Sequence, residues 1–95
     1  MKPETITEIL TKQFGAKLEG DAIVVQEGAE ITIFASLTGE TLSVPRVTRL
    51  ILDGAMVFAE TARGERFALA ADDVRALKVD RTEHGRKDRN AGFGR

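Results

Sequence analysis

The sequence predicts a mainly β fold, either a small antiparallel β-barrel or a strongly bent sheet, with one short N-terminal helix. Two observations lead to this prediction. Residues 30–80 contain five or six short runs rich in β-branched and aromatic residues, a composition typical of strands. Glycine-containing turn signals separate these runs at regular intervals, as in a chain that folds strand against strand. An open α+β sheet with the helix on one face is the alternative.

A helix is predicted over about residues 5–14. Thr5 and Glu8 have the spacing of a capping box, in which each side chain satisfies a backbone amide at the helix start. The apolar residues that follow share one helical face: Ile6, Ile9, Leu10 and Phe14. Gly15 then suits a left-handed helix end. Because so short a helix is marginal in isolation, its apolar face is expected to dock on the sheet.

The first strands are predicted at Ala22–Gln26 and from Ile31 onward, each after a turn signal that contains glycine. Alternation along the second of these strands places one set of side chains inward: Ile31, Ile33 and Ala35. Phe34 belongs to the alternate set and points away from the main core. We therefore expect Phe34 to cover a second face or to lie in an interface. The chain then turns at Thr38–Glu40.

Pro45 cannot donate a backbone hydrogen bond, so it predicts a strand end, an edge or a bulge. Residues 47–52 are apolar on both faces. Alternation places Val47 and Ile51 on one face, and Leu50 and Leu52 on the other. Such a strand is usually covered on both sides, so both leucines are expected to be deeply buried.

Asp53 and Gly54 are the strongest hairpin signal in the chain and predict a type I′ turn. The elements expected after it are a strand at 55–61, a tight turn at Arg63-Gly64, a strand at 65–70, one turn of helix at 71–74 capped by an aspartate, and a last short strand that contains Leu77 and Val79.

Residues 31–53 and 56–80 align as two three-strand units, which predicts an internal duplication. The first strands align with Ile31 and Ile33 over Met56 and Phe58. The third strands align with Val47, Leu50, Leu52 and Asp53 over Val74, Leu77, Val79 and Asp80. A coincidental match between two meandering segments is the alternative.

The 95 residues, 42% of them apolar and 31% charged, are typical of one soluble domain, which we assign to residues 1–80. The chain has no cysteine, which excludes disulfides and thiolate chemistry and makes a reducing cytoplasm the expected location. The first ten residues lack the apolar run of a signal peptide. No apolar stretch is long enough to predict a membrane span.

Residues 81–95 differ from the rest in charge. Residues 1–80 carry nine Lys or Arg against thirteen Asp or Glu, a net charge of −4, whereas residues 81–95 carry five against two, a net charge of +3. The segment has too few apolar residues to order itself. It is predicted to be a disordered basic tail, in which Arg86, Lys87 and Arg89 are candidate contacts to a partner.

No motif predicts a catalytic site, a metal site or a cofactor site, and we expect the chain not to be an enzyme. His84 is the only histidine and lies in the predicted tail. Asp72 and Asp73 are adjacent, so capping is favoured over binding of a divalent cation. Glu40 and Glu65 follow turn glycines, where solvated carboxylates are favoured over an acid–base pair.

An N-terminal helix, a five-stranded meander and a helical turn before the last strand resemble, in outline, Sm-like and SH3-like barrels over most of residues 5–80. The resemblance implies a small barrel. Sm-like proteins carry a second glycine shortly after the turn glycine, whereas no glycine occurs in the five residues after Gly39. No functional residue is therefore carried over, since fold alone does not give function.

Two functions fit these features. The favoured one is a protein-interaction module or assembly subunit, which binds another protein or itself through a sheet edge or an apolar patch around Phe34 and Pro45. The other is a nucleic-acid-associated protein that uses the basic tail, with possible additions from the body at Arg46, Arg49, Arg63 and Arg66. If these arginines share one surface with the start of the tail, nucleic-acid binding is favoured; intervening acids weigh against it.

Overall fold

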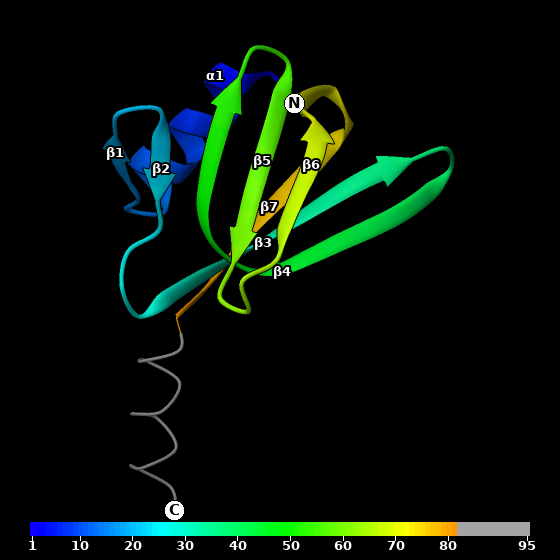
Figure 1. Cartoon of the computed structure of the whole chain (residues 1–95). Helices are drawn as coiled ribbons and strands as arrows, with labels where there is room; N and C mark the ends of the chain where they lie inside the picture. Colours follow the sequence, from blue (N-terminus) through cyan, green and yellow to red (C-terminus); the bar gives the residue numbers. More distant parts are fainter. Residues whose placement is uncertain (82–95) are drawn as a thin grey trace, which may run out of the picture.

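The prediction of a mainly β chain is confirmed by the computed structural model, which describes residues 1–81 (Figure 1). The strands form one antiparallel sheet that curls strongly into a half-barrel. The helical elements are α1 (Pro3–Glu8), the π-helical turn η1 (Ile9–Gln13) and the 3₁₀ turn η2 (Ala71–Asp73). The strands are β1 (Lys17–Glu19), β2 (Ala22–Val24), β3 (Ala29–Leu37), β4 (Glu40–Asp53), β5 (Met56–Thr61), β6 (Arg66–Ala70) and β7 (Val74–Arg81).

The long strand β4 connects the two arms of the sheet. Its first half pairs with β3, and its second half pairs with β2 along one edge and with β5 along the other. β6 adds to β5, and β7 adds to the far edge of β3. The bend of β4 between these two sets of partners produces the curl of the sheet (Figure 1).

Pro45 lies at a β-bulge, one of the three placements predicted for it. Ile31 and Ile33 are two residues apart on β3, but their partners on β4 are three residues apart. Arg46, the residue after the proline, has a φ of +61°, which places it in the left-handed region. A bulge bends and twists the strand that contains it, so the irregularity lies where β4 changes direction.

A second irregularity in β4 falls at Thr48, because Val47 and Arg49 pair with consecutive residues of β5. The extra residue changes the alternation, so that Val47 and Leu50 both face the core and both are 0% exposed. The prediction that these two side chains lie on opposite faces is therefore wrong. Deep burial is confirmed for Leu50, whereas Leu52 is only partly buried against the core.

The N-terminal helix is confirmed, but it begins earlier than predicted and without the capping box. Lys2 is the N-cap, it makes no side-chain capping hydrogen bond, and Pro3 opens the first turn. Because the fixed φ of proline suits the first helical position, Thr5 lies inside the helix instead of capping it. The helix continues through η1 and stops before Gly15, whose φ of +78° is the predicted left-handed end.

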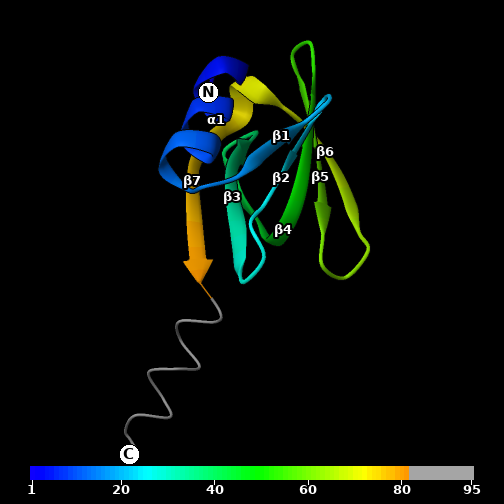
Figure 2. The same cartoon turned by 90° about the vertical axis from the view of Figure 1, so that its left-hand side faces the viewer.

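The helix docks on the core with Ile6 and Leu10 fully buried, as predicted. It lies beside η2 and the start of β7 at one end of the half-barrel (Figure 2). The terminal ammonium of Met1 donates hydrogen bonds to the carbonyl oxygens of Ala71 at 2.8 Å and Val74 at 3.0 Å, which fix the start of the helix against η2. The buried strand residues of this core are Ile23, Ala29, Ile31, Ile33, Val44, Val47, Leu50, Val57, Ala59, Leu69 and Val74.

The two tight hairpins have different turn types, and a type was predicted only for the second of them. In the β3–β4 turn, Thr38 and Gly39 have φ values of +45° and +86°, the arrangement of a type I′ turn. In the β4–β5 turn the loop residues are Gly54 and Ala55, and of these only Gly54 has a positive φ. The hairpin after Asp53 is confirmed, but its predicted type I′ geometry is wrong.

Several element bounds also differ from the prediction. The sequence does not predict β1, whose three side chains are all exposed and show no alternation. β2 ends at Val24, two residues early, and β7 is longer than predicted because its pairing with β3 extends to Arg81. The helical turn η2 is confirmed, although it has no side-chain cap from an aspartate. Arg81, the first residue of the predicted tail, thus belongs to the sheet, and residues 82–95 lie outside the described part of the chain.

The two aligned three-strand units, residues 31–53 and 56–80, pair with each other in the sheet. The third strand of each unit pairs with the first strand of the other, since β7 pairs with β3 and the second half of β4 pairs with β5. Leu50 and Leu52 pair with Ala59 and Val57, just as their aligned counterparts Leu77 and Val79 pair with Ile33 and Ile31. The first strands must therefore be realigned by one residue: Ile31 corresponds to buried Val57, not to exposed Met56.

Candidate functional site

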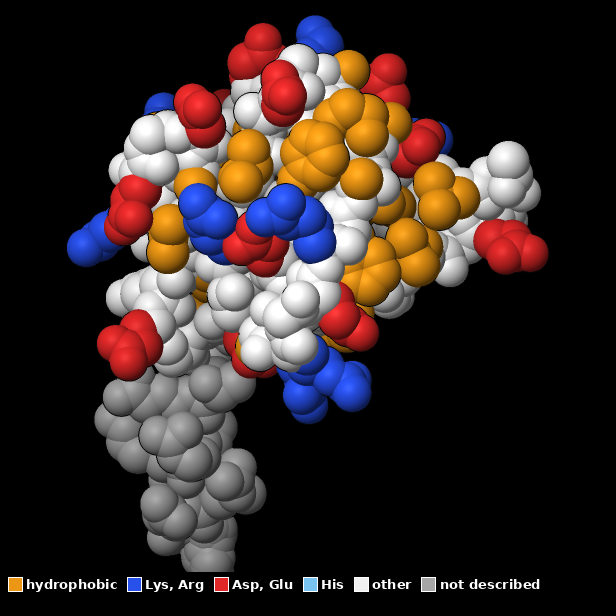
Figure 3. All heavy atoms as spheres, viewed as in Figure 1, with side chains coloured by type: hydrophobic (Ala, Val, Ile, Leu, Met, Phe, Trp, Pro, Cys, Tyr) orange, Lys and Arg blue, Asp and Glu red, His pale blue; other side chains and the backbone are white. Residues whose placement is uncertain are grey.

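The side of β4, β5 and β6 that faces away from the core carries a regular array of side chains. The pairing register sets them in three rows, with one residue from each strand. The rows are Asp53–Met56–Ala70, Ile51–Phe58–Ala68 and Arg49–Glu60–Arg66. We call these nine residues the outer face. Figure 3 shows hydrophobic side chains gathered over these strands, next to a line in which two basic groups flank an acidic one.

The middle row and Met56 give the outer face an apolar patch. Met56 is 37% exposed and Ala68 is exposed, while Ile51 and Phe58 are half-buried. None of these four side chains belongs to the core or to the partly buried residues packed against it. The patch is open to solvent in Figure 3, which views the molecule from this side. A contiguous apolar group of this kind on a sheet face is typical of an interaction surface.

The third row is a line of charges held together by Glu60. Nη1 of Arg49 donates to Oε1 of Glu60 at 3.2 Å, and Nη2 of Arg66 donates to Oε2 of the same carboxylate. The Glu60 side chain is 24% exposed, whereas those of Arg49 and Arg66 are 44% and 63% exposed. Hydrogen bonds from Arg66 and then Arg49 hold the pKa of Glu60 below its usual value of 4.5. The row therefore carries two cations and one anion at neutral pH, a net charge of +1.

We expect the stabilising effect of Glu60 to disappear in acid. Its pKa is lower in the folded chain than in the unfolded chain, so its contribution is present above about pH 4.5 and is lost as the pH falls through the folded value. The difference in melting temperature between the wild type and Glu60→Gln should therefore shrink as the pH falls from 7 into the acid range. Glu40→Gln, at an exposed turn position outside the row, is the matched control. A wild-type advantage that persists unchanged in acid would contradict the assignment.

β6 ends the sheet on this side, because among the described residues it pairs with β5 alone. The amide of Thr61 donates to the carbonyl of Glu65 at 2.9 Å, and the amide of Ala71 donates to that of Ala55 at 2.8 Å. These bonds direct the backbone N–H and C=O groups of the odd-numbered residues from 65 to 71 toward β5. Backbone direction alternates along an antiparallel ladder. The N–H and C=O groups of Ala68 therefore point away from β5, as do those of Arg66 and Ala70. The apolar patch therefore continues to an edge whose backbone groups pair with no other strand of residues 1–81.

A shallow depression of about 430 Å³ lies beside the charged row, lined by Thr48, Arg49, Glu60, Thr61, Gly64, Glu65 and Arg66. Thr61 is buried, and its hydroxyl accepts hydrogen bonds from the amides of Arg63 at 3.3 Å and Glu65 at 3.2 Å. These bonds fix the β5–β6 turn next to the ion row. The depression is thus part of the border of the outer face.

The structure brings together only some of the residues predicted to bind a partner. Arg49 and Arg66 meet at Glu60, while Arg46 lies close to the β5–β6 turn, where its carbonyl accepts from the amide of Ala62 at 2.9 Å. Arg63 is the next residue of that turn and is exposed.

Phe34 and Pro45 are not among the residues of the outer face. Phe34 is half-buried on the other arm of the sheet, between its strand partners Ser43 and Ala76. Pro45 is exposed at the bulge. Their binding role stays a prediction.

The arginines do not form an uninterrupted basic surface. Glu60 separates Arg49 from Arg66, and Glu65 lines the same depression. This arrangement is the one that weighs against nucleic-acid binding by the body of the chain. The tail contacts predicted at Arg86, Lys87 and Arg89 lie outside the described residues.

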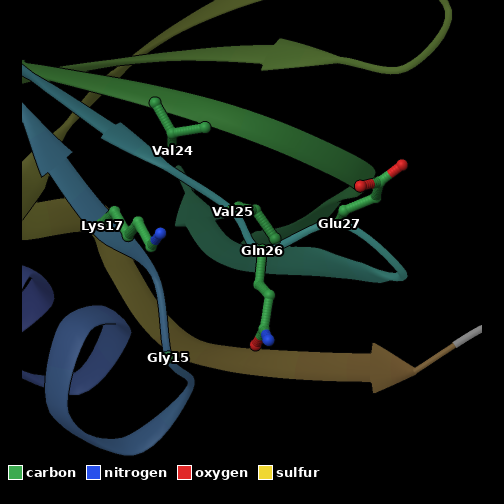
Figure 4. A pocket seen from close by; sticks show the side chains of 6 residues that line it. All are labelled: Gly15, Lys17, Val24, Val25, Gln26 and Glu27. Carbon is green, nitrogen blue, oxygen red and sulfur yellow. The ribbon is translucent and has the colours of Figure 1, made fainter.

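A second depression, of about 420 Å³, lies between the end of the helix and β2. Its lining residues are Gly15, Lys17, Val24, Val25, Gln26 and Glu27 (Figure 4). The side chains of Lys17 and Gln26 extend from separate segments of the chain (Figure 4). Within residues 1–81 no three metal-ligating side chains converge. No helix in the same part of the chain has the length and apolar character needed to cross a membrane.

Sequence reasoning missed the centre of the outer face. The signal was present in two places, the two-faced run at 47–52 and the alternation of Met56, Phe58 and Glu60, but joining them requires the register of β4 against β5. Comparisons with protein-family models, with curated proteins and with solved structures give no match to this chain, so its function must be argued from the outer face itself.

Proposed function

We propose that this chain is a non-enzymatic protein-interaction module that binds its partner on the outer face. One observation carries the proposal: an apolar patch centred on Phe58 is bordered by the Arg49–Glu60–Arg66 row on the same three strands. Stable protein interfaces have this anatomy, with an apolar centre enriched in Phe and Met and a polar border that contains Arg. The unpaired edge at Ala68 adds backbone donors and acceptors to the same surface.

Photo-crosslinking from single positions in the producing cell tests this proposal. A photoreactive residue in place of Ala68, in the outer face, should give a discrete covalent adduct. The matched control replaces Ala76, an exposed alanine on β7 beside Phe34. We expect adduct from Ala68 and little from Ala76, because the outer face is covered by a partner in the cell.

The mass of the adduct separates self-association from binding to another protein. Equal or diffuse labelling from Ala68 and Ala76 would contradict a binding role for the outer face. Adduct from Ala76 alone would move the site to the arm that contains Phe34, the patch predicted from the sequence.

A further inference from the structure

We propose that the partner on the outer face is a second copy of this chain, packed face to face about a two-fold axis that runs along the Ile51–Phe58–Ala68 row. This inference rests on the proposed function and identifies the partner that binds on the outer face. The argument depends on how charge is distributed over the three rows.

The rows are evenly spaced on either side of the proposed axis. On β4 the middle row is at Ile51, with Asp53 two residues to one side and Arg49 two residues to the other. A two-fold rotation about the middle row exchanges the flanking rows and keeps β4 over β4. Arg49 of each copy therefore faces Asp53 of the second copy, and the contact is formed twice.

The net charges of the facing rows also match. The Arg49–Glu60–Arg66 row has two cations and one anion, a net charge of +1, and it faces a row whose only charge is that of Asp53. Opposite charges across an interface fix the orientation of the partners. The outer face is thus self-complementary, as an interface with two-fold symmetry requires.

The other face-to-face arrangement is excluded by the same charges. A two-fold axis parallel to the strands keeps each row opposite its own copy and places β4 over β6. Arg49 would then face Arg66, and Glu60 would face Glu60 of the second copy. Like charges placed against each other in this way oppose association.

The middle row supplies the apolar centre of the proposed dimer. Phe58 lies on the axis and meets its own copy, with Ile51 and Ala68 on either side. Sheets that pack on each other in this way lie about 10 Å apart and are rotated by roughly 30°. Glu19 on β1 continues the middle row beyond β2. The proposed axis brings Glu19 of the two copies toward each other at the margin of the interface, where both carboxylates stay in water.

A charge exchange tests this geometry on the full chain by sedimentation equilibrium. We expect a monomer–dimer equilibrium for the wild type. Asp53→Arg and Arg49→Asp should each weaken it by about tenfold or more, because each places two like-charged pairs in the interface. The double variant restores opposite charges and should return to within about threefold of the wild type. In it, Glu60 keeps its bond to Arg66.

The matched control is Glu40→Arg, which changes net charge by the same two units at an exposed turn away from the outer face. It should leave the dissociation constant unchanged. Three results would overturn the proposal: a chain that stays monomeric at millimolar concentration, a double variant no tighter than the single ones, or a control as weak as Asp53→Arg. A monomer whose Ala68 position still crosslinks to another protein would leave the proposed function intact and exclude this dimer.

A single cysteine distinguishes face packing from pairing of two β6 edges, since the chain has none of its own. In the proposed dimer two Ala68→Cys residues lie about 10 Å apart, beyond the Cα separation of roughly 4.4–6.8 Å that a disulfide spans. A bismaleimide of matching length should join them under reducing conditions. Ready formation of a direct disulfide would instead indicate that two β6 strands pair at their edges, and it would overturn the face-to-face arrangement.

Discussion

Replacing Leu50 by Ala should lower the free energy of unfolding by about 2–5 kcal/mol, which is a large part of the stability of a domain of this size. Leu50 is 0% exposed and lies in the second half of β4, between β2 and β5. Its strand neighbours are Ile23 on β2 and Ala59 on β5, both in the core. Because β4 is fixed by hydrogen bonding along both edges, the cavity cannot close by a shift of the strand. Urea denaturation followed by far-ultraviolet circular dichroism measures the effect, since the chain has no Trp or Tyr.

Alanine substitutions of two further leucines give stability losses to compare with that of Leu50→Ala. Leu52→Ala should cost less than Leu50→Ala because Leu52 is only partly buried. Leu18→Ala, at a side chain 60% exposed, should change stability by no more than about 0.5 kcal/mol. Equal losses at Leu50 and Leu52 would contradict the shallower burial of Leu52 and support the equal, deep burial of both leucines that the sequence predicts.

Replacing Leu10 by Ala should destabilise the chain by a similar amount, about 2–5 kcal/mol. Leu10 is 0% exposed and, with Ile6, forms the helical contribution to the core. A helix this short has little stability of its own, so loss of its docking side chain should also release it from the sheet. Chemical denaturation measures the loss, and amide hydrogen exchange at residues 6–13 should become faster than in the strands.

Gln13→Ala is the matched control for the helix, because Gln13 is exposed at the end of the same element. Alanine favours helix formation slightly more than glutamine, so this variant should be as stable as the wild type or slightly more stable. If Leu10→Ala leaves the unfolding midpoint where it was, the helix is not part of the cooperative core, and the curled sheet alone holds the fold.

The elements of this protein follow from local chemistry, which is why most of them can be predicted. Strand composition, glycine turns and the apolar face of the helix depend only on near neighbours in the sequence. Pro45 is an example, since its missing amide predicts an irregularity that the structure places at a bulge. The predicted capping box at Thr5 is wrong for an equally local reason, namely that Pro3 starts the helix earlier.

The candidate site could be predicted only in part, because strand register assembles it. Arg49, Glu60 and Arg66 are far apart in the sequence and meet only because β4, β5 and β6 pair as they do. Arg49 and Arg66 are among the predicted partner-binding residues, but the carboxylate that joins them is not. Ile51 and Phe58 are likewise neighbours only across the β4–β5 pair.

A curled sheet with one docked helix is predictable from the sequence of this chain, because backbone preferences and side-chain alternation depend on each residue and its near neighbours. Which face each strand turns toward the core is set by tertiary packing. A shift of one residue reverses every side chain of a strand, and the irregularities at Arg46 and Thr48 make such shifts within β4. Their positions are set by how distant strands bury their side chains together. The outer face around Phe58 therefore exists only once β4, β5 and β6 have paired.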